Sequence, residues 1–434
     1  MFWTDPSTFH SAQAQADCSE ALSWLRGTEV ERILRGQVTS LGSMLDDTYA
    51  YYGKVAQPII QQYLKSISSC LSPSVVDFCR AYALVSSRAF FVDAFHGLAM
   101  VPIADAFNHS IDNHVHLESD FDVCSICGSL EECPHDHGHR DLDGEIGSTM
   151  SSTATNPPSN APQTEADPFD NYYEMVSTTP IEPNVEVYNT YGDTLANAQL
   201  LAHYGFILDG NDHDCCTWSD EELDRVFRQL QLQWSSLIAS NSMPIALKYA
   251  DSALVSSFDK SRLTYHLHKA ETTPSSQLYC INADGRISHY IWLRCALASI
   301  STTSTSLEEL LARAVRVQLD LEAAVEAMQD DDGDEDIWEI GTDAEALLLV
   351  HRVAVLVTAI CAYRREGAGK PLDPSACDNV NERDLGDILD DTPESMPRTR
   401  LALTYVMGEL AILSSCQSAW SEVGELTSSL LARS

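Results

Sequence analysis

The spacing of apolar residues changes along this 434-residue chain, and the change limits the folds that it can adopt. From residue 17 to about residue 90, apolar side chains recur at helical spacing, as in Leu22, Leu25 and Val30. Short extended segments and turns follow, and helical spacing returns almost without interruption beyond Gly210. We therefore predict an α+β fold, with a β-rich part over residues 1–210 and an α-helical part over residues 211–434.

Within the first part, the pattern predicts particular strands and one helix. The segments FFVD and GLAMVPI flank a turn at Phe95-His96-Gly97, which predicts a hairpin. The segments YYEMVSTTPI and VEVYNTYG are joined by Glu182-Pro183-Asn184, which predicts two further strands joined by a turn. A helix is expected from about Thr194, and Gly205 suits its C-terminal cap.

The C-terminal part carries helix start signals. Capping-box spacing occurs at residues 306–309 and again at residues 342–345, and a last helix is expected after Pro397. The most apolar helical stretch, residues 344–363, contains His351 and Arg352, which are costly in a bilayer. We therefore expect no membrane span.

Charge and cysteine content limit the kinds of partner. There are 26 Lys and Arg residues against 64 Asp and Glu residues, and the resulting net charge of −38 repels phosphate backbones and attracts basic partners. We expect no nucleic acid ligand and a basic protein partner, although acidity can also serve solubility alone. Thirteen cysteines cannot all pair, and no secretory signal is visible. We expect an intracellular protein of the cytoplasm or nucleus, monomeric and with reduced thiols.

Residues 111–169 form a candidate insertion whose two halves differ in composition. Its second half, from about residue 141, is rich in Ser, Thr, Pro, Asn and acidic residues and has no periodic apolar face, which is typical of a flexible segment. Its first half contains a CxxC pair followed closely by another cysteine and by histidines. Thiolate and imidazole ligands suit tetrahedral zinc, and the alternative is a polar loop with free thiols. The candidate ligands are Cys124, Cys127, Cys133 and His135, with His137 or His139 as alternatives to His135.

Three segments together resemble one family. They are SRAF (residues 87–90), ADAFNHS (residues 104–110) and VEVYNTYGDTLANAQLLAHYGF (residues 185–206). Their order is similar to that of the SET domain in the Rubisco large-subunit lysine methyltransferase class. Residues 17–75 resemble the helical insertion of that domain, and residues 211–434 resemble the family's helical substrate-binding domain.

The resemblance implies a fold, an activity and a set of site residues. The fold would be a SET-type β-rich domain followed by a helical domain, and the activity would be transfer of a methyl group from S-adenosylmethionine to a lysine of a protein such as a histone or ribosomal protein. Tyr191 matches the active-site tyrosine. The residues implied to bind the cofactor are Arg88, Asp105, Asn108, His109 and Tyr204, and those implied to line the substrate channel are Phe107 and Phe206.

Alternatives to this reading come from within the family and from the residues themselves. Members of the family also methylate histidine. The family begins its SET domain with a glycine-containing strand, whereas the first glycine here is Gly27. A non-catalytic binding module is therefore a second expectation. Without the resemblance, Arg88 and Asp105 would be read as an ordinary salt bridge, and Phe107 and Phe206 as core aromatic residues.

Overall fold

The computed structural model describes residues 11–36, 44–66, 73–118, 123–129, 133–135, 173–230, 255–268, 278–300, 306–329, 343–369 and 385–433. By its contacts the chain divides into two compact units, of which unit 1 comprises residues 1–80 and 194–434 and unit 2 comprises residues 81–193. The predicted mixture of helices and short strands is confirmed. The contact division differs from the predicted boundary at residue 210, because residues 1–80 and 194–210 group with the helical part.

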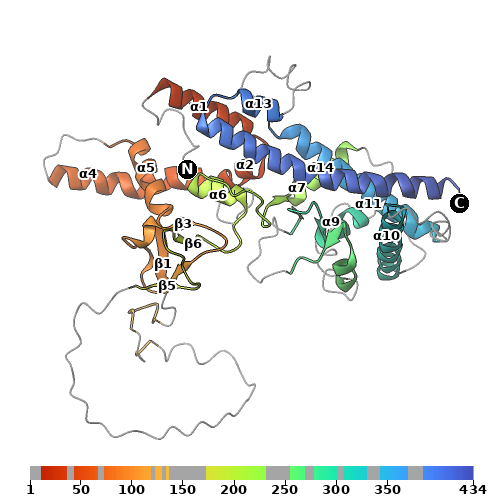
Figure 1. Cartoon of the computed structure of the whole chain (residues 1–434), viewed down its shortest axis with the longest axis horizontal. Coiled ribbons are helices and arrows are strands. Elements are labelled where there is room, and N and C mark those ends of the chain that lie inside the picture. Colours follow the sequence, from red (N-terminus) through yellow and green to blue (C-terminus); the bar gives the residue numbers. More distant parts are fainter. Residues whose placement is uncertain are drawn as a thin grey trace, which may run out of the picture. The chain divides into compact units, whose positions relative to one another are not determined.

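The N-terminal part of unit 1 is helical, as its periodicity predicts (Figure 1). Ser11 caps the first helix, because its hydroxyl accepts a hydrogen bond from the Ala14 N–H at 3.1 Å. The helices are α1 (Ala12–Trp24), α2 (Glu29–Leu34), α3 (Met44–Tyr51), the π-helical turn η2 (Tyr52–Ala56), α4 (Gln57–Ser66) and α5 (Val75–Ser86), the last of which contains the boundary between the units.

The remaining helices of unit 1 form its main core. Two long helices, α11 (Ala344–Gly367) and α14 (Pro397–Leu431), pack along each other, and α14 also packs on α1. Trp292, Trp420 and Phe258 are among the largest fully buried side chains of this core. The other helices are α6 (Asn197–Tyr204), α7 (Asp220–Gln229), η5 (Val255–Lys260), α9 (His289–Ser299), α10 (Leu307–Gln329) and α13 (Leu385–Asp391).

Unit 1 also contains a small sheet, which corrects the expectation of an almost wholly helical chain beyond Gly210. Its four strands, in the order β7-β9-β10-β8, are β7 (Cys215–Thr217), β8 (Thr264–Tyr265), β9 (Cys280–Asn282) and β10 (Ile287–Ser288). Each strand has only two or three residues, which is too short for an alternating pattern to stand out in the sequence.

A carboxylate from the first helix caps the last one. The Asp17 side chain accepts hydrogen bonds from the N–H groups of Arg398 at 3.2 Å and Thr399 at 2.9 Å, at the start of α14. Asp17 is 1% exposed. The negative charge and the acceptor oxygens thus satisfy main-chain donors that a helix leaves unpaired at its N-terminus.

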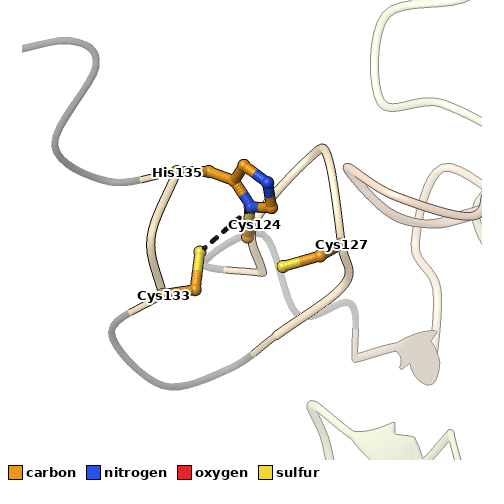
Figure 2. A group of neighbouring side chains, drawn as sticks. All are labelled: Cys124, Cys127, Cys133 and His135. Carbon is orange, nitrogen blue, oxygen red and sulfur yellow. Dashed lines mark hydrogen bonds between the residues drawn. The ribbon is translucent and has the colours of Figure 1, made fainter.

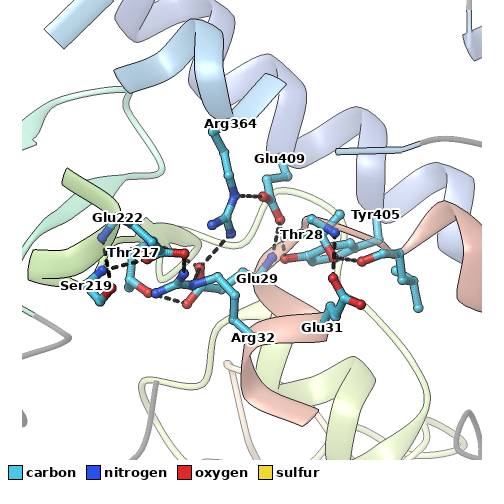
Figure 3. A network of polar contacts seen from close by, with 12 residues as sticks. Thr28, Glu29, Glu31, Arg32, Thr217, Ser219, Glu222, Arg364, Tyr405 and Glu409 are labelled. Carbon is cyan, nitrogen blue, oxygen red and sulfur yellow. Dashed lines mark hydrogen bonds and ion pairs between the residues drawn. The ribbon is translucent and has the colours of Figure 1, made fainter. Parts of the chain in front are cut away.

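A buried network of charges joins α2 to α11 and α14 (Figure 3). Arg364 of α11 donates from Nη2 to Glu29 at 3.0 Å and from Nε to Glu409 at 3.2 Å. Glu409 also accepts from the Tyr405 hydroxyl at 2.9 Å, and Glu29 from the Thr217 hydroxyl at 2.5 Å. Buried charges need partners of this kind, so the network fixes how these segments of unit 1 join.

Helix α11 is long and apolar enough to cross a membrane by length and composition, and 56% of its most apolar window is buried within the protein. Its polar side chains have protein partners. The His351 ring contacts the Thr427 hydroxyl at 3.0 Å, and Arg352 donates to the Ser299 carbonyl at 2.7 Å. These contacts favour a core helix over a membrane span.

The described residues of unit 2 contain three pairs of short strands. The predicted hairpin is confirmed, with β1 (Ala89–Asp93) antiparallel to β2 (Gly97–Met100). The Asp93 carboxylate accepts from the N–H groups of Phe95 and His96 in the turn, and Gly97 has a φ of +64°. Such a φ favours glycine.

The two further predicted strands both form, as β5 (Met175–Ser177) and β6 (Tyr188–Asn189), but they do not pair with each other. Each pairs with an earlier segment. β5 is antiparallel to β4 (Val115–Leu117), and β6 is parallel to β3 (Asn108–His109). The turn at residues 182–184 therefore separates two sheets and does not close a hairpin.

Candidate functional site

The parallel pairing of β3 with β6 brings distant sequence motifs together. Asn108 lies opposite Tyr188 and His109 opposite Asn189, and the Ser110 N–H donates to the Asn189 carbonyl at 3.0 Å. Tyr191 lies two residues after the end of β6. The Asn-His pair and the tyrosine that the resemblance selected are therefore neighbours in space.

Tyr191 is fixed by two hydrogen bonds to the segment around β3. Its hydroxyl donates to the Phe107 carbonyl at 3.1 Å, and its N–H donates to Nδ1 of His109 at 3.0 Å. The rings of Tyr191 and His109 lie 5.2 Å apart between centroids. These contacts hold the position and direction of the phenol ring.

The protonation states of Tyr191 and His109 follow from burial. Burial raises the pKa of Tyr191, against a smaller lowering by Arg88, so the hydroxyl is protonated at neutral pH. Burial lowers the pKa of His109, against a smaller raising by Asp193. His109 is therefore neutral at pH 7, with its proton on Nε2 because Nδ1 accepts the Tyr191 N–H.

The other predicted cofactor residues of unit 2 lie close to one another. Arg88, just before β1, donates from Nη1 to the Asp105 carbonyl at 3.3 Å, and the same atom is 3.7 Å from the Asp105 carboxylate. Asp105 lies in a 3-10 turn, η3 (Ala104–Ala106). The Arg88 side chain is 51% exposed, so the guanidinium remains accessible to a ligand.

Asn108 has a partner that sequence reasoning missed. Its side-chain amide donates to the Glu186 carboxylate at 2.6 Å, and Glu186 also accepts from the Tyr188 hydroxyl at 3.1 Å. Glu186 stands in the segment VEVYNTYG, so its place in that motif was the available signal.

A second residue that sequence reasoning missed is Ile103. Its φ of +78° is strained for a β-branched residue, and its side chain is 79% exposed.

The two remaining predicted residues belong to unit 1. Tyr204 ends α6, and Gly205 caps this helix with a φ of +81°, as predicted. The rings of Tyr204 and Phe206 are 6.3 Å apart and tilted by 47°. Both side chains are half-buried.

Unit 1 also has a cavity of about 640 Å³ with an acidic lining. Burial raises the pKa of Asp214, one of its lining carboxyls, in spite of the hydrogen bonds that it accepts from Asn197. The acidic residues of the lining are Asp209, Asp212, Asp214, Asp284 and Glu409.

The predicted metal ligands of unit 2 come together. The ligand atoms of Cys124, Cys127, Cys133 and His135 all lie within 4.8 Å of one another (Figure 2). Hydrogen bonds from the N–H groups of Ile126 and Cys127 lower the pKa of the Cys124 thiol to about 6. His137 and His139 lie outside the described residues.

Comparison with known proteins gives one match in sequence and several in structure. No family model matches the chain. Ribosomal lysine N-methyltransferase 3 of Saccharomyces cerevisiae (strain ATCC 204508 / S288c) is 30% identical over 161 residues, which is 31% of this chain. The match spans 29% of the length of that relative.

The structural matches are weaker. A crystal structure of the SET domain of LSMT bound to MeLysine and AdoHcy is 12% identical, with a TM-score of 0.44, and covers 98% of this chain and 70% of that chain. A structure of Rubisco LSMT bound to Sinefungin and Monomethyllysine is 13% identical, with a TM-score of 0.44, and covers 97% of this chain and 68% of that chain. The sequence match, in contrast, confirms the resemblance: over 31% of its length, this chain is similar to a ribosomal lysine methyltransferase.

Proposed function

We propose that this chain is an S-adenosylmethionine-dependent protein-lysine N-methyltransferase. The observation that carries the proposal is the contact of Tyr191 with residues 107–109, which lie more than 80 positions earlier in the chain. A tyrosine held in this way beside an Asn-His pair is what the family resemblance implies. The 30% identical relative, which is named a lysine methyltransferase, supports the same activity.

The chemistry requires positioning more than it requires reactive side chains. When bound, S-adenosylmethionine supplies a sulfonium methyl group, which passes in line to an amine nitrogen as the carbon–sulfur bond breaks and the carbon–nitrogen bond forms. Tyr191 already donates its hydroxyl proton to Phe107, so its oxygen can act only as an acceptor toward a polarised methyl C–H. A protonated hydroxyl is a poor base, so Tyr191 does not take up the amine proton.

The residues implied to bind the cofactor fit its polar groups. The exposed guanidinium of Arg88 suits a carboxylate, the Asp105 carboxylate suits an ammonium group, and the Asn108 amide suits an adenine edge. The main chain at His109 would complete this set. The family resemblance implies Tyr204 as a further cofactor residue, and Phe107 and Phe206 as substrate-channel residues whose aromatic faces would favour an ammonium chain.

The substrate that we propose is a basic protein, such as a ribosomal protein or a histone. The net charge of −38 and the acidic lining of the cavity in unit 1 support a cationic partner. The protein would act as a monomer in the cytoplasm or nucleus, without nucleic acid or membrane as a ligand. The Cys/His cluster has no part in methyl transfer, because displacement from a sulfonium needs no metal.

Two measurements on the full chain test the proposal. Titration calorimetry with S-adenosylmethionine should detect binding. Incubation with the methyl-labelled cofactor and a ribosomal protein fraction should give labelled methyllysine after acid hydrolysis. Label on histidine would show that the methyl acceptor is histidine and not lysine. Cofactor binding without any labelled product would favour a binding module, and absence of both would contradict the proposal.

A further inference from the structure

A compact turn in unit 2 gathers three thiols and one imidazole. Cys124 and Cys127 belong to the segment Cys124–Gly128, and Cys133 and His135 follow in a second short segment (Figure 2). None of the three cysteines forms a disulfide. Their sulfur atoms and Nδ1 of His135 lie within 4.8 Å of one another, which is a spacing suited to a shared ligand and not to four separate surface groups.

The main chain of this turn holds the thiols inward. The Gly128 N–H donates to the Cys124 carbonyl at 2.7 Å, and the Cys124 N–H donates to the Ser129 carbonyl at 2.9 Å. The N–H groups of Ile126 and Cys127 donate to the Cys124 sulfur. Gly128 has a φ of +73°, which lets the chain reverse directly after the second cysteine. A tight knuckle of this kind presents two sulfurs to one metal ion.

Two distances within the cluster agree with tetrahedral coordination. Zinc binds sulfur at about 2.3 Å and nitrogen at about 2.0 Å, so two such ligands at the tetrahedral angle lie about 3.6 Å apart. Nδ1 of His135 lies 3.6 Å from the sulfur of Cys133 and 3.7 Å from that of Cys124. Three thiolates and one neutral imidazole are soft and borderline donors, which favours zinc over the oxygen-seeking magnesium and calcium ions.

We propose that Cys124, Cys127, Cys133 and Nδ1 of His135 bind one zinc ion, and that this ion holds the turn against the β1–β2 hairpin. The turn contacts the hairpin at Gly128, where an added Cβ would lie 2.8 Å from Cδ1 of Phe95. Cys133 is the one buried member of the set, so this small segment has little apolar core of its own, and a metal supplies the constraint that a core would give.

The test begins with the metal content of the full-length protein purified without chelator. Elemental analysis should find close to one zinc per chain. Exchange for cobalt should give the intense visible bands of tetrahedral cobalt together with thiolate charge-transfer bands. Protein that neither contains zinc nor takes up cobalt into a tetrahedral thiolate site would overturn the proposal, whether or not the chain transfers methyl groups.

Variants test the four ligands separately. Cys127→Ser and His135→Ala should each lose most of the zinc, whereas His135→Cys restores a fourth soft ligand and should retain it. Cys79→Ser, a thiol on α5 outside the cluster, is the matched control and should keep its metal. If His135→Ala retained zinc and His137→Ala or His139→Ala lost it, the assignment of His135 would be wrong. Retention of zinc in Cys127→Ser would contradict the site itself.

Discussion

At the residue scale, the Tyr191 hydroxyl is the atom on which the proposed chemistry depends. Its proton is donated to the Phe107 carbonyl, so replacing Tyr191 by Phe removes an oriented oxygen and keeps the ring that packs on His109. We predict that Tyr191→Phe lowers turnover at least about tenfold, equivalent to about 1.4 kcal/mol of activation barrier, with a smaller loss of cofactor affinity. Single-turnover transfer of labelled methyl groups, together with calorimetry, measures the two effects.

Tyr173→Phe is the matched control for that variant. It removes a hydroxyl of the same unit, one that donates to the Asp93 carboxylate at the β1–β2 turn. The control should retain turnover close to that of the wild-type protein. Equal turnover in Tyr191→Phe and the wild-type protein would show that the tyrosine has no role in the transfer.

A second residue-scale prediction concerns acid stability and His289. This side chain is fully buried and accepts a hydrogen bond from the Leu267 N–H at 3.1 Å. Burial, followed by the neighbouring His266, lowers the pKa of His289 to about 3. Below about pH 6.5, His289 is therefore protonated in the unfolded chain and neutral in the folded chain. The free energy of unfolding then decreases by about 1.4 kcal/mol for each pH unit by which the pH is lowered.

The measurement is the free energy of unfolding in denaturant between about pH 7 and about pH 5. His289→Gln can keep an acceptor oxygen but cannot titrate, so its stability should fall less steeply over this range than that of the wild-type protein. Groups that titrate elsewhere contribute equally to both proteins. Parallel pH profiles would mean that His289 is not responsible for the acid sensitivity.

The sequence predicted the roles of some single residues and not of others. Gly205 and the turn at residues 95–97 were predictable, because a helix end and a tight turn need particular residues. The motif VEVYNTYG drew attention to Glu186, but its partner was not predictable, because nothing local indicates that the carboxylate accepts the Asn108 amide from 78 positions earlier. The strained Ile103 was equally invisible, since β-branched residues are not expected at positive φ.

At the scale of elements, the sequence predicted which segments are strands better than it predicted their partners. β5 and β6 were both expected, but their neighbours in the sheets are β4 and β3. Alternation indicates which residues face a core, whereas pairing between residues 58 to 80 positions apart depends on the whole fold. The cap on α14 is a similar case, because Asp17 and Thr399 are 382 positions apart.

That cap gives a prediction about one helix. Asp17→Ala removes the acceptor for the N–H groups of Arg398 and Thr399 and leaves buried donors without a partner. We expect the free energy of unfolding to fall by about 1–2 kcal/mol. Asp17→Asn keeps one of the two oxygens, which accept separately from Arg398 and Thr399, so the free energy of unfolding should fall by less. Equal losses in the two variants would show that the oxygen that remains does not stabilise the start of α14.

At the scale of the whole molecule, the sequence pattern predicted the α+β fold class but not how the chain divides into two compact units. The α+β character followed from the change of periodicity, whereas the return of residues 194–434 to the same unit as residues 1–80 did not. The buried network explains the difference. Glu29 near the N-terminus requires Arg364 and Glu409 near the C-terminus, and no periodic pattern records a partner so far away (Figure 3).

The charge of the whole chain leads to a prediction about its substrate. A net charge of −38 attracts a basic protein before the two are in contact. Salt weakens this long-range attraction, because the Debye length is about 8 Å at physiological ionic strength. We therefore predict that the KM for a basic ribosomal protein fraction rises several-fold between about 0.05 M and about 0.3 M sodium chloride, while kcat changes little, because the reacting groups are already in contact in the complex.

Initial rates of label transfer at each salt concentration measure both constants. Calorimetry with the cofactor under the same conditions is the control, since weaker cofactor binding would also slow transfer. Asp209→Asn together with Asp212→Asn, which removes two exposed carboxylates from the acidic cavity of unit 1, should reduce the salt dependence in part if the cavity contributes. A KM that stays constant across this range would mean that shape and local contacts, and not the field of the acidic chain, select the substrate.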